Sequence, residues 1–295
     1  MKIRPKRLQK GDAVGIIALG NPVPLEKLRP QLTLFEEMGL QYKLGQTIGR
    51  NGGYLAGSDE ERLGDLHQMM ENPEVKAIFC ASVGYGAARI ADRIDYPLLS
   101  EHPKIFWGCS DATYLHIAFH RYADVATFHG PALSEELDGR SKKMFYQLFA
   151  PYEIYYDETL SPLESISPGA ARGEIIGGNL RRITDTLGTK FEIDVHGKIL
   201  LLEEVDLAIE EMDNMLSRLR LAGKLKEASG FAIGRMGNGE EEVNALLREY
   251  LLPYKKPALA GFNIGHSLPN LGIPLGVEAI LDADEKVLRL LPGVE

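Results

Sequence analysis

The chain has 295 residues, of which 44% are hydrophobic and 25% are charged, and its formal net charge is −9. This composition is typical of a globular protein with enough residues for two domains of ordinary size. The acidic balance argues against a nucleic-acid-binding protein, because phosphate backbones bind basic surfaces.

The first half of the chain alternates between strand-like and helix-like patterns. Apolar runs predict buried strands over residues 13–19, 75–81, 104–110 and 126–132. Apolar residues at helical spacing predict helices over residues 25–38, 86–94 and 111–122, and another that follows a capping box of Ser58 and Glu61. Pro30 is expected in the first turn of its helix. The alternation predicts a doubly wound parallel sheet with helices on both faces.

The alternating pattern is interrupted over residues 151–170, which contain three prolines. We therefore expect an N-terminal α/β domain over residues 1–155, a linker over residues 156–170 and a C-terminal domain over residues 171–295. The second domain is expected to be the smaller one, with a mixed α/β, β-rich fold. Its predicted elements are strands at 198–205, 230–236 and 257–265, helices at 208–221 and 240–252, and a hairpin around 282–285.

The N-terminus carries basic residues before an apolar stretch, as a secretory signal does. That stretch is too short for a signal core, and Gly11 and Asp12 interrupt it. No apolar run approaches the length of a membrane span. We therefore expect a cytoplasmic protein without a membrane partner.

A glycine-containing loop, SVGYG, follows the strand predicted at 75–81. Such a loop before a helix could bind a phosphate. A dinucleotide fingerprint, however, requires Gly or Ala where this chain has Arg89, and the acidic residue expected about 20 positions later is missing. Two other interpretations remain open: a tight turn, or backbone N–H groups that form half of an oxyanion hole.

Histidines and cysteines show no convincing metal-ligand spacing. His116 and His120 are four residues apart on one predicted helix, but Ile117 occupies the place of the glutamate in an HExxH motif, so packing is the better interpretation. The two cysteines, Cys80 and Cys109, form no CxxC pair. We therefore expect no metal and no organic cofactor.

The window IFWGCSDAT places Cys109 and Ser110 where a predicted strand meets a helix. A nucleophile there would be exposed above the sheet, and the helix N-terminus would offer free N–H groups to an oxyanion. Ser110 could equally serve as the helix N-cap, which this window alone favours.

Serine catalysis also requires a base and an acid that orients it, and the second half offers both. His266 lies in a loop rich in Gly and Pro after a predicted strand. Glu203 and Glu204 follow directly on another apolar run, and a carboxylate at the end of a buried strand is costly unless it is paired.

Several motifs in order resemble the LD-carboxypeptidases, which are serine peptidases of family S66 that include muramoyltetrapeptide carboxypeptidases and microcin C immunity peptidases. The likeness spans nearly the whole chain and includes FWGCSDAT, TFHGP, GEIIGGNL and LLLEEV. It implies that Ser110 is the nucleophile, Glu203 the orienting acid and His266 the general base. It also implies an oxyanion hole made by the backbone N–H groups of Gly84 and Asp111.

Two departures from the family pattern concern the glycine loop and the acidic motif. Ser82 and Val83 stand where the family usually has Arg and Gly, and Glu203-Glu204 replaces the commoner Glu-Asp. Because neighbouring residues on a strand face opposite ways, one of these two carboxylates at most can face His266.

The resemblance implies hydrolysis of the amide between an L-configured centre and a C-terminal D-amino acid. The expected substrate is a small peptide such as murein tetrapeptide, which would release D-Ala in cell-wall recycling, and the expected assembly is a homodimer. Two alternatives remain: a peptidase for peptidyl nucleotides of the microcin C type, and a non-catalytic α/β binding protein.

Overall fold

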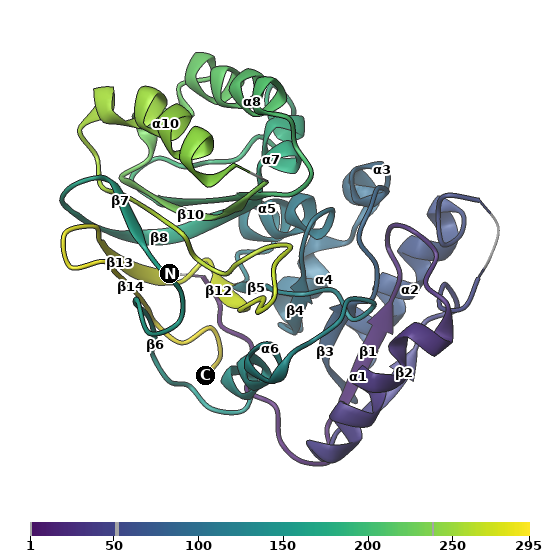
Figure 1. Cartoon of the computed structure of the whole chain (residues 1–295). Helices are drawn as coiled ribbons and strands as arrows, with labels where there is room; N and C mark the ends of the chain where they lie inside the picture. The colour runs from purple at the N-terminus through teal and green to yellow at the C-terminus, as the bar shows by residue number, and fades with distance from the viewer. Residues whose placement is uncertain (1, 51–52, 238) are drawn as a thin grey trace.

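The computed structural model describes residues 2–50, 53–237 and 239–295, and it contains two sheets in two adjoining lobes (Figure 1). One sheet has six strands in the order β12-β5-β4-β3-β1-β2. The other has eight strands in the order β6-β14-β13-β8-β9-β10-β11-β7. The expected two-domain α/β fold is confirmed.

The six-stranded sheet is parallel except at one edge. Its parallel strands are β1 (Ala13–Ile17), β2 (Gln41–Leu44), β3 (Val75–Cys80), β4 (Ile105–Gly108) and β5 (Thr127–His129). The order 2-1-3-4-5 is that of a doubly wound sheet. The edge strand β12 (Ile273–Leu275) comes from the second half of the chain and pairs antiparallel with β5 (Figure 1). The two halves are thus joined by a shared sheet as well as by packing.

The four helices predicted in the first lobe are present, and the short α4 and α6 were not predicted. The helices of this lobe are α1 (Leu25–Glu37), α2 (Asp59–Glu71), α3 (Ala87–Ile90), α4 (Tyr96–Glu101), α5 (Ala112–Tyr122) and α6 (Gly139–Lys143). The capping box of Ser58 and Glu61 is formed at the start of α2. The position predicted for Pro30 is wrong, because α1 begins at Leu25 and Pro30 lies beyond the first turn. Its exposed ring costs the helix one hydrogen bond, which the buried face of α1 offsets.

The eight-stranded sheet is mixed. Strands β8 (Ala170–Asn179), β9 (Ile199–Glu204), β10 (Gly230–Met236) and β11 (Ala258–Ala260) are parallel neighbours. Antiparallel strands flank them: β6 (Ile154–Tyr156), β7 (Glu164–Ser167), β13 (Glu278–Asp282) and β14 (Val287–Leu290). The hairpin predicted around 282–285 is the β13–β14 pair. The stretch 156–170, predicted as a linker, contributes β7 to this sheet, because its backbone pairs with β11.

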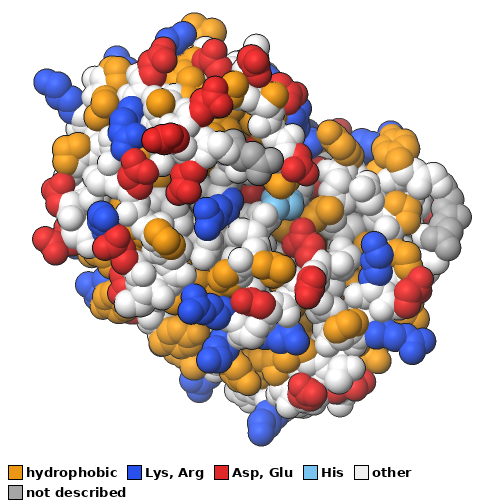
Figure 2. All heavy atoms as spheres, in the orientation of Figure 1, with side chains coloured by type: hydrophobic (Ala, Val, Ile, Leu, Met, Phe, Trp, Pro, Cys, Tyr) orange, Lys and Arg blue, Asp and Glu red, His pale blue; other side chains and the backbone are white. Residues whose placement is uncertain are grey.

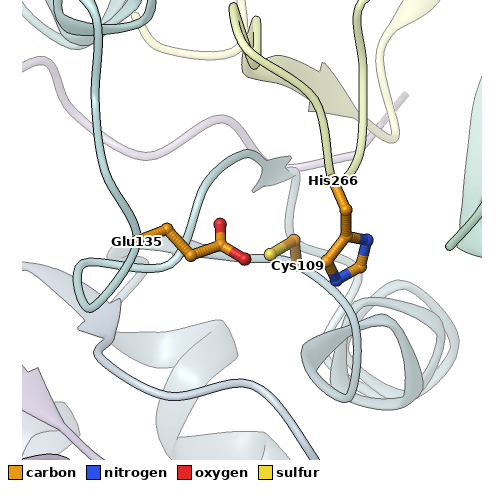
Figure 3. Close-up of side chains that lie close together, drawn as sticks. All are labelled: Cys109, Glu135 and His266. Carbon is orange, nitrogen blue, oxygen red and sulfur yellow. The ribbon is translucent and has the colours of Figure 1, made fainter. Parts of the chain in front are cut away.

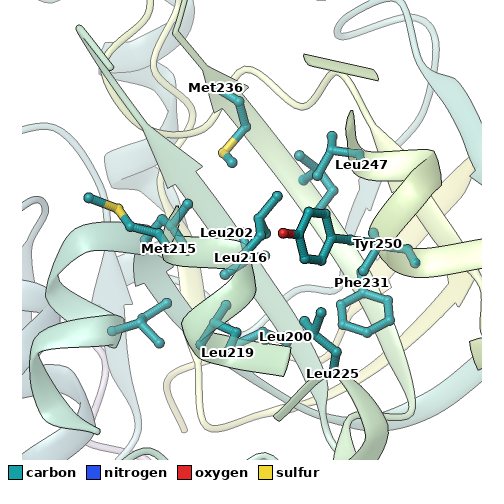
Figure 4. Packing of buried hydrophobic residues seen from close by; sticks show 14 of the residues in the cluster. Leu200, Leu202, Met215, Leu216, Leu219, Leu225, Phe231, Met236, Leu247 and Tyr250 are labelled. Carbon is teal, nitrogen blue, oxygen red and sulfur yellow. The ribbon is translucent and has the colours of Figure 1, made fainter. Parts of the chain in front are cut away.

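Helices α7 (Leu180–Thr186), α8 (Ile209–Leu221) and α10 (Glu240–Leu251) lie together over one face of the eight-stranded sheet, and the short α9 (Lys224–Glu227) follows α8 (Figure 1). Figure 4 shows the apolar core between the helices and the sheet, where strand residues such as Leu200 and Phe231 meet Leu216 and Leu247. None of the described helices is long and apolar enough to cross a bilayer.

Helix α5 contacts both lobes next to the candidate site. It packs against β8 and α7 of the second lobe. The Thr113 hydroxyl on α5 accepts a hydrogen bond of 3.0 Å from the backbone N–H of Asn179 at the end of β8. The carboxyl ends of β4 and β9 therefore face one region, as is usual for ligand sites in parallel sheets.

Candidate active site

The turn between β4 and α5 holds Ser110 in a strained backbone conformation. Its φ of 54° lies in the left-handed region, which non-glycine residues seldom adopt and which recurs at active sites. The turn is tight: a Cβ on Gly108 would lie 2.8 Å from the Cβ of Ala112 and 2.9 Å from that of Cys80. The helix N-cap is Asp111, so the N-cap alternative for Ser110 is wrong. This geometry is that of a nucleophile elbow.

The glycine loop lies against this elbow. Gly84 has a φ of 109°, and a Cβ there would collide with the side chain of Asn21 at 2.3 Å. The Asp111 carboxylate accepts a hydrogen bond of 2.7 Å from the backbone N–H of Ala87, which fixes the loop to the elbow. Within the described chain, neither the Gly84 N–H nor the Asp111 N–H donates to another protein group. Both are thus available as oxyanion donors.

The Ser82 side chain and the Val83 backbone both anchor this loop. The buried Ser82 hydroxyl accepts a hydrogen bond of 3.1 Å from the backbone N–H of Gly20. The Val83 carbonyl accepts another, of 3.1 Å, from the N–H of Asn21. These two bonds anchor the glycine loop to the segment after β1.

Glu203 and His266 form a buried acid–base pair. The Nδ1 of His266 lies 3.2 Å from Oε2 of Glu203, whose side chain is fully buried, while that of His266 is 16% exposed. Because a carboxylate only accepts, Nδ1 carries the proton in the neutral ring, and Nε2 is then the nitrogen with the lone pair. A Cβ on Gly265 would lie 2.3 Å from the same Oε2, so glycine is required for this approach. The imidazole is therefore held in the orientation that a general base requires.

Glu204 faces away from His266, as expected for the next residue on the strand. Its Oε1 accepts from the side-chain amide of Asn179 at 2.9 Å, and its Oε2 accepts from the backbone N–H of Arg181 at 3.0 Å. It holds the start of α7, and Glu203 is the carboxylate that faces the histidine.

His266 reaches the elbow from the second lobe. One of its ring nitrogens, the Cys109 sulfur and a Glu135 carboxylate oxygen all lie within 4.8 Å of one another (Figure 3). In the part of the chain that the structure describes, the Ser110 hydroxyl makes no hydrogen bond. The bond from Ser110 to His266 therefore stays a prediction.

Two residues of this site were missed in the sequence. Glu135 lies beside His266, but its segment carries no pattern that marks it. His129 lies with its Nε2 3.6 Å from Oε1 of Glu203, and both side chains are fully buried. Burial holds the pKa of His129 well below its usual value, because it disfavours the charged form of the ring. Its position in the TFHGP motif at the end of β5 is the signal that could have found it.

His116 and His120 are packing residues, as predicted. Both are buried on α5. The Nε2 of His116 donates to the carbonyl of Gly108 at 2.9 Å, and the Nε2 of His120 lies 3.1 Å from the Thr127 hydroxyl. Neither belongs to a group with metal-ligand spacing among the described residues.

Comparison with known proteins also relates this chain to the LD-carboxypeptidases. Residues 14–130 match the model of the LD-carboxypeptidase N-terminal domain, and residues 172–281 match that of the C-terminal domain. A probable murein peptide carboxypeptidase of Bacillus subtilis is 43% identical, over 100% of this chain and 96% of that relative. The microcin C7 self-immunity protein MccF of Escherichia coli is 23% identical, over 96% of this chain and 94% of that relative.

A solved structure shares the complete architecture. The crystal structure of an MccF-like protein from Bacillus anthracis superposes with a TM-score of 0.91 at 25% identity, covering 98% of this chain and 99% of that one. The two matched domains, the relative at 43% identity and this shared architecture show that the chain belongs to the LD-carboxypeptidase family and is a serine carboxypeptidase.

Proposed function

We propose that this enzyme hydrolyses the amide between an L-configured centre and a C-terminal D-amino acid, and that it releases D-Ala from murein tetrapeptide in cell-wall recycling. The observation that carries the proposal is the buried Glu203–His266 pair beside the Ser110 elbow. The likeness to the murein peptide carboxypeptidase supports the substrate class.

The proposed reaction uses protein groups alone. Ser110 Oγ attacks the scissile carbonyl while Nε2 of His266 takes its proton. The N–H groups of Gly84 and Asp111 stabilise the oxyanion of the tetrahedral intermediate. His266 then gives the proton to the leaving amine of the D-amino acid, and water releases the acyl group by the same steps in reverse order. Glu203 keeps the imidazole in position and stabilises its charged form.

The activity is expected to rise with pH to an alkaline midpoint. Burial by itself would lower the pKa of His266, but the hydrogen bond and the charge of Glu203, with the charges of Glu135 and Glu204, outweigh it and raise this pKa from 6.5 to about 9. Because only the neutral imidazole accepts a proton, kcat/KM should rise as the pH passes through this value. A profile of kcat/KM against pH measures the midpoint. A plateau already complete below about pH 7 would contradict the assigned environment of His266.

Removal of metals should leave turnover intact. None of the steps above uses a metal, so dialysis against EDTA should not lower kcat on a tetrapeptide substrate. The test is the turnover rate before and after dialysis. A loss of activity that added zinc restores would show that the triad mechanism is incomplete.

A second substrate class is favoured by one observation, the likeness to the microcin C7 self-immunity protein. The two classes differ in the leaving group, which is a D-amino acid in one and an aminoacyl nucleotide in the other. Measuring kcat/KM for murein tetrapeptide and for a peptidyl nucleotide decides between them. We expect a higher kcat/KM for the tetrapeptide. A higher kcat/KM for the peptidyl nucleotide would instead assign the enzyme to the second substrate class.

We also propose a cytoplasmic homodimer, on the strength of the family resemblance. Recycled murein peptides would meet the enzyme in that compartment. Light scattering of the purified protein should give twice the monomer mass, and a monomer mass at micromolar concentration would overturn the dimer.

A further inference from the structure

Cys109, Glu135 and His266 come together from three separate segments. Cys109 belongs to the elbow after β4, Glu135 follows β5, and His266 follows β11. A sulfur, a carboxylate oxygen and a ring nitrogen from these residues all lie within 4.8 Å of one another (Figure 3). Cys109 is 1% exposed, whereas Glu135 and His266 are partly exposed. Figure 2 shows histidine and acidic side chains at the surface where the lobes meet.

These spacings suit a small divalent cation. Three atoms separated by no more than 4.8 Å lie within about 2.8 Å of a common centre, and zinc bonds are about 2.3 Å to sulfur and about 2.0–2.2 Å to nitrogen and oxygen. Each ligand atom would have to move inward by less than about 1 Å. Flexible side chains such as Glu135 can make that adjustment without a backbone shift.

We propose that Cys109, Glu135 and His266 form a binding site for Zn²⁺ or another thiophilic divalent cation, and that its occupation inhibits the enzyme. The cation would take the lone pair of His266 that accepts the Ser110 proton. Zinc is thus an inhibitor here and takes no part in the reaction. The inhibition rests on the proposed role of His266 as general base, whereas the binding of the cation does not.

The surroundings of His266 support the site independently. Histidines that bind metals usually donate their other ring N–H to a carboxylate, which fixes the ring and its tautomer. The hydrogen bond of 3.2 Å from Nδ1 of His266 to Glu203 has this arrangement. In its neutral form the ring therefore presents a nitrogen lone pair on the side away from Glu203.

The charges around Cys109 favour a cation and oppose a free thiolate. Burial raises the pKa of the Cys109 thiol well above its usual value, and the negative charges of Glu135 and Glu203 add to this effect. A bound divalent cation instead stabilises the Cys109 thiolate, and the thiol proton is released to solvent.

Cobalt(II) provides a test that does not depend on activity. The chain has two cysteines, so Cys80→Ser is a matched control for Cys109→Ser. Titrating the metal-free protein with Co²⁺ should produce a thiolate-to-cobalt absorption band that saturates at one equivalent. The band should persist in Cys80→Ser, disappear in Cys109→Ser and require at least about tenfold more Co²⁺ in Glu135→Gln.

Zinc should then displace the cobalt and stop hydrolysis over the same concentration range, with each rate compared with that variant's own metal-free rate. Absence of the band in the wild-type protein, or its survival in Cys109→Ser, would overturn the site. Zinc binding at Cys109 without inhibition would overturn the inhibitory role. If the metal-free protein cleaves neither substrate class but shows the band, the proposed function fails and the metal site stands.

Discussion

Ser110→Ala is expected to lower kcat by at least about 10³-fold, the scale typical of losing a member of a catalytic triad. The alanine keeps the β4–α5 turn but has no hydroxyl to attack the carbonyl. Cys109→Ser is expected to keep most of the activity, because the neighbouring cysteine is buried and burial disfavours its thiolate. Steady-state kinetics on a tetrapeptide, with circular dichroism to verify folding, measures both effects.

The pair of variants also distinguishes the two possible nucleophiles at the elbow. An inactive Cys109→Ser with an active Ser110→Ala would assign the attack to the sulfur. The strained φ of Ser110 argues against that result, since strain of this kind is retained where it presents a reacting side chain.

Glu203→Gln is expected to lower kcat by about 10³–10⁴-fold, comparable with the loss of the orienting carboxylate in other serine peptidase triads. The amide would keep the shape of the side chain but would no longer stabilise a charged imidazole. It should also lower the pKa of His266, because the bond and the charge of Glu203 hold that pKa near 9. The rise of kcat/KM with pH, called here the acid limb of the profile, should therefore occur at lower pH.

Glu204→Gln is the matched control for this effect. Its carboxylate contacts Asn179 and the start of α7, not His266, so the loss of kcat should be smaller and the acid limb should move much less. If Glu204→Gln shifted the acid limb and Glu203→Gln did not, Glu204 and not Glu203 would be the carboxylate that orients His266.

The sequence was sufficient to predict many of the local elements and the ends of the strands that bear the site, but it did not predict β2, β8, α4, α6 or α7. Apolar periodicity marks the helix over Ile209–Leu221 and the strand over Ile199–Glu204 almost to the residue. The acidic pair Glu203-Glu204 was also identifiable, because a carboxylate at the end of a fully apolar strand needs a partner. The choice of Glu203 came from the family resemblance. The β4–α5 elbow followed from the Gly-Cys-Ser-Asp window together with the family resemblance.

Long-range pairing could not be predicted in the same way. Strand β12 joins the sheet of the first lobe across about half the chain, and β7 is a four-residue strand in a stretch rich in Pro and Ser. Periodicity reports which face of an element is buried, not which partner covers it. Glu135 was missed for the same reason, since only the fold brings it to His266, whereas the TFHGP motif was an unused signal for His129.

The stereochemistry of the leaving residue tests the central proposal most directly. Purified enzyme is incubated with murein tetrapeptide, which ends in D-Ala, and with the same peptide ending in L-Ala, and the released alanine is quantified by chromatography. We predict release of D-Ala from the first peptide, little or no release from the second, and loss of the activity in Ser110→Ala. Equal cleavage of both peptides, or cleavage of the L-terminated one alone, would contradict an LD-carboxypeptidase.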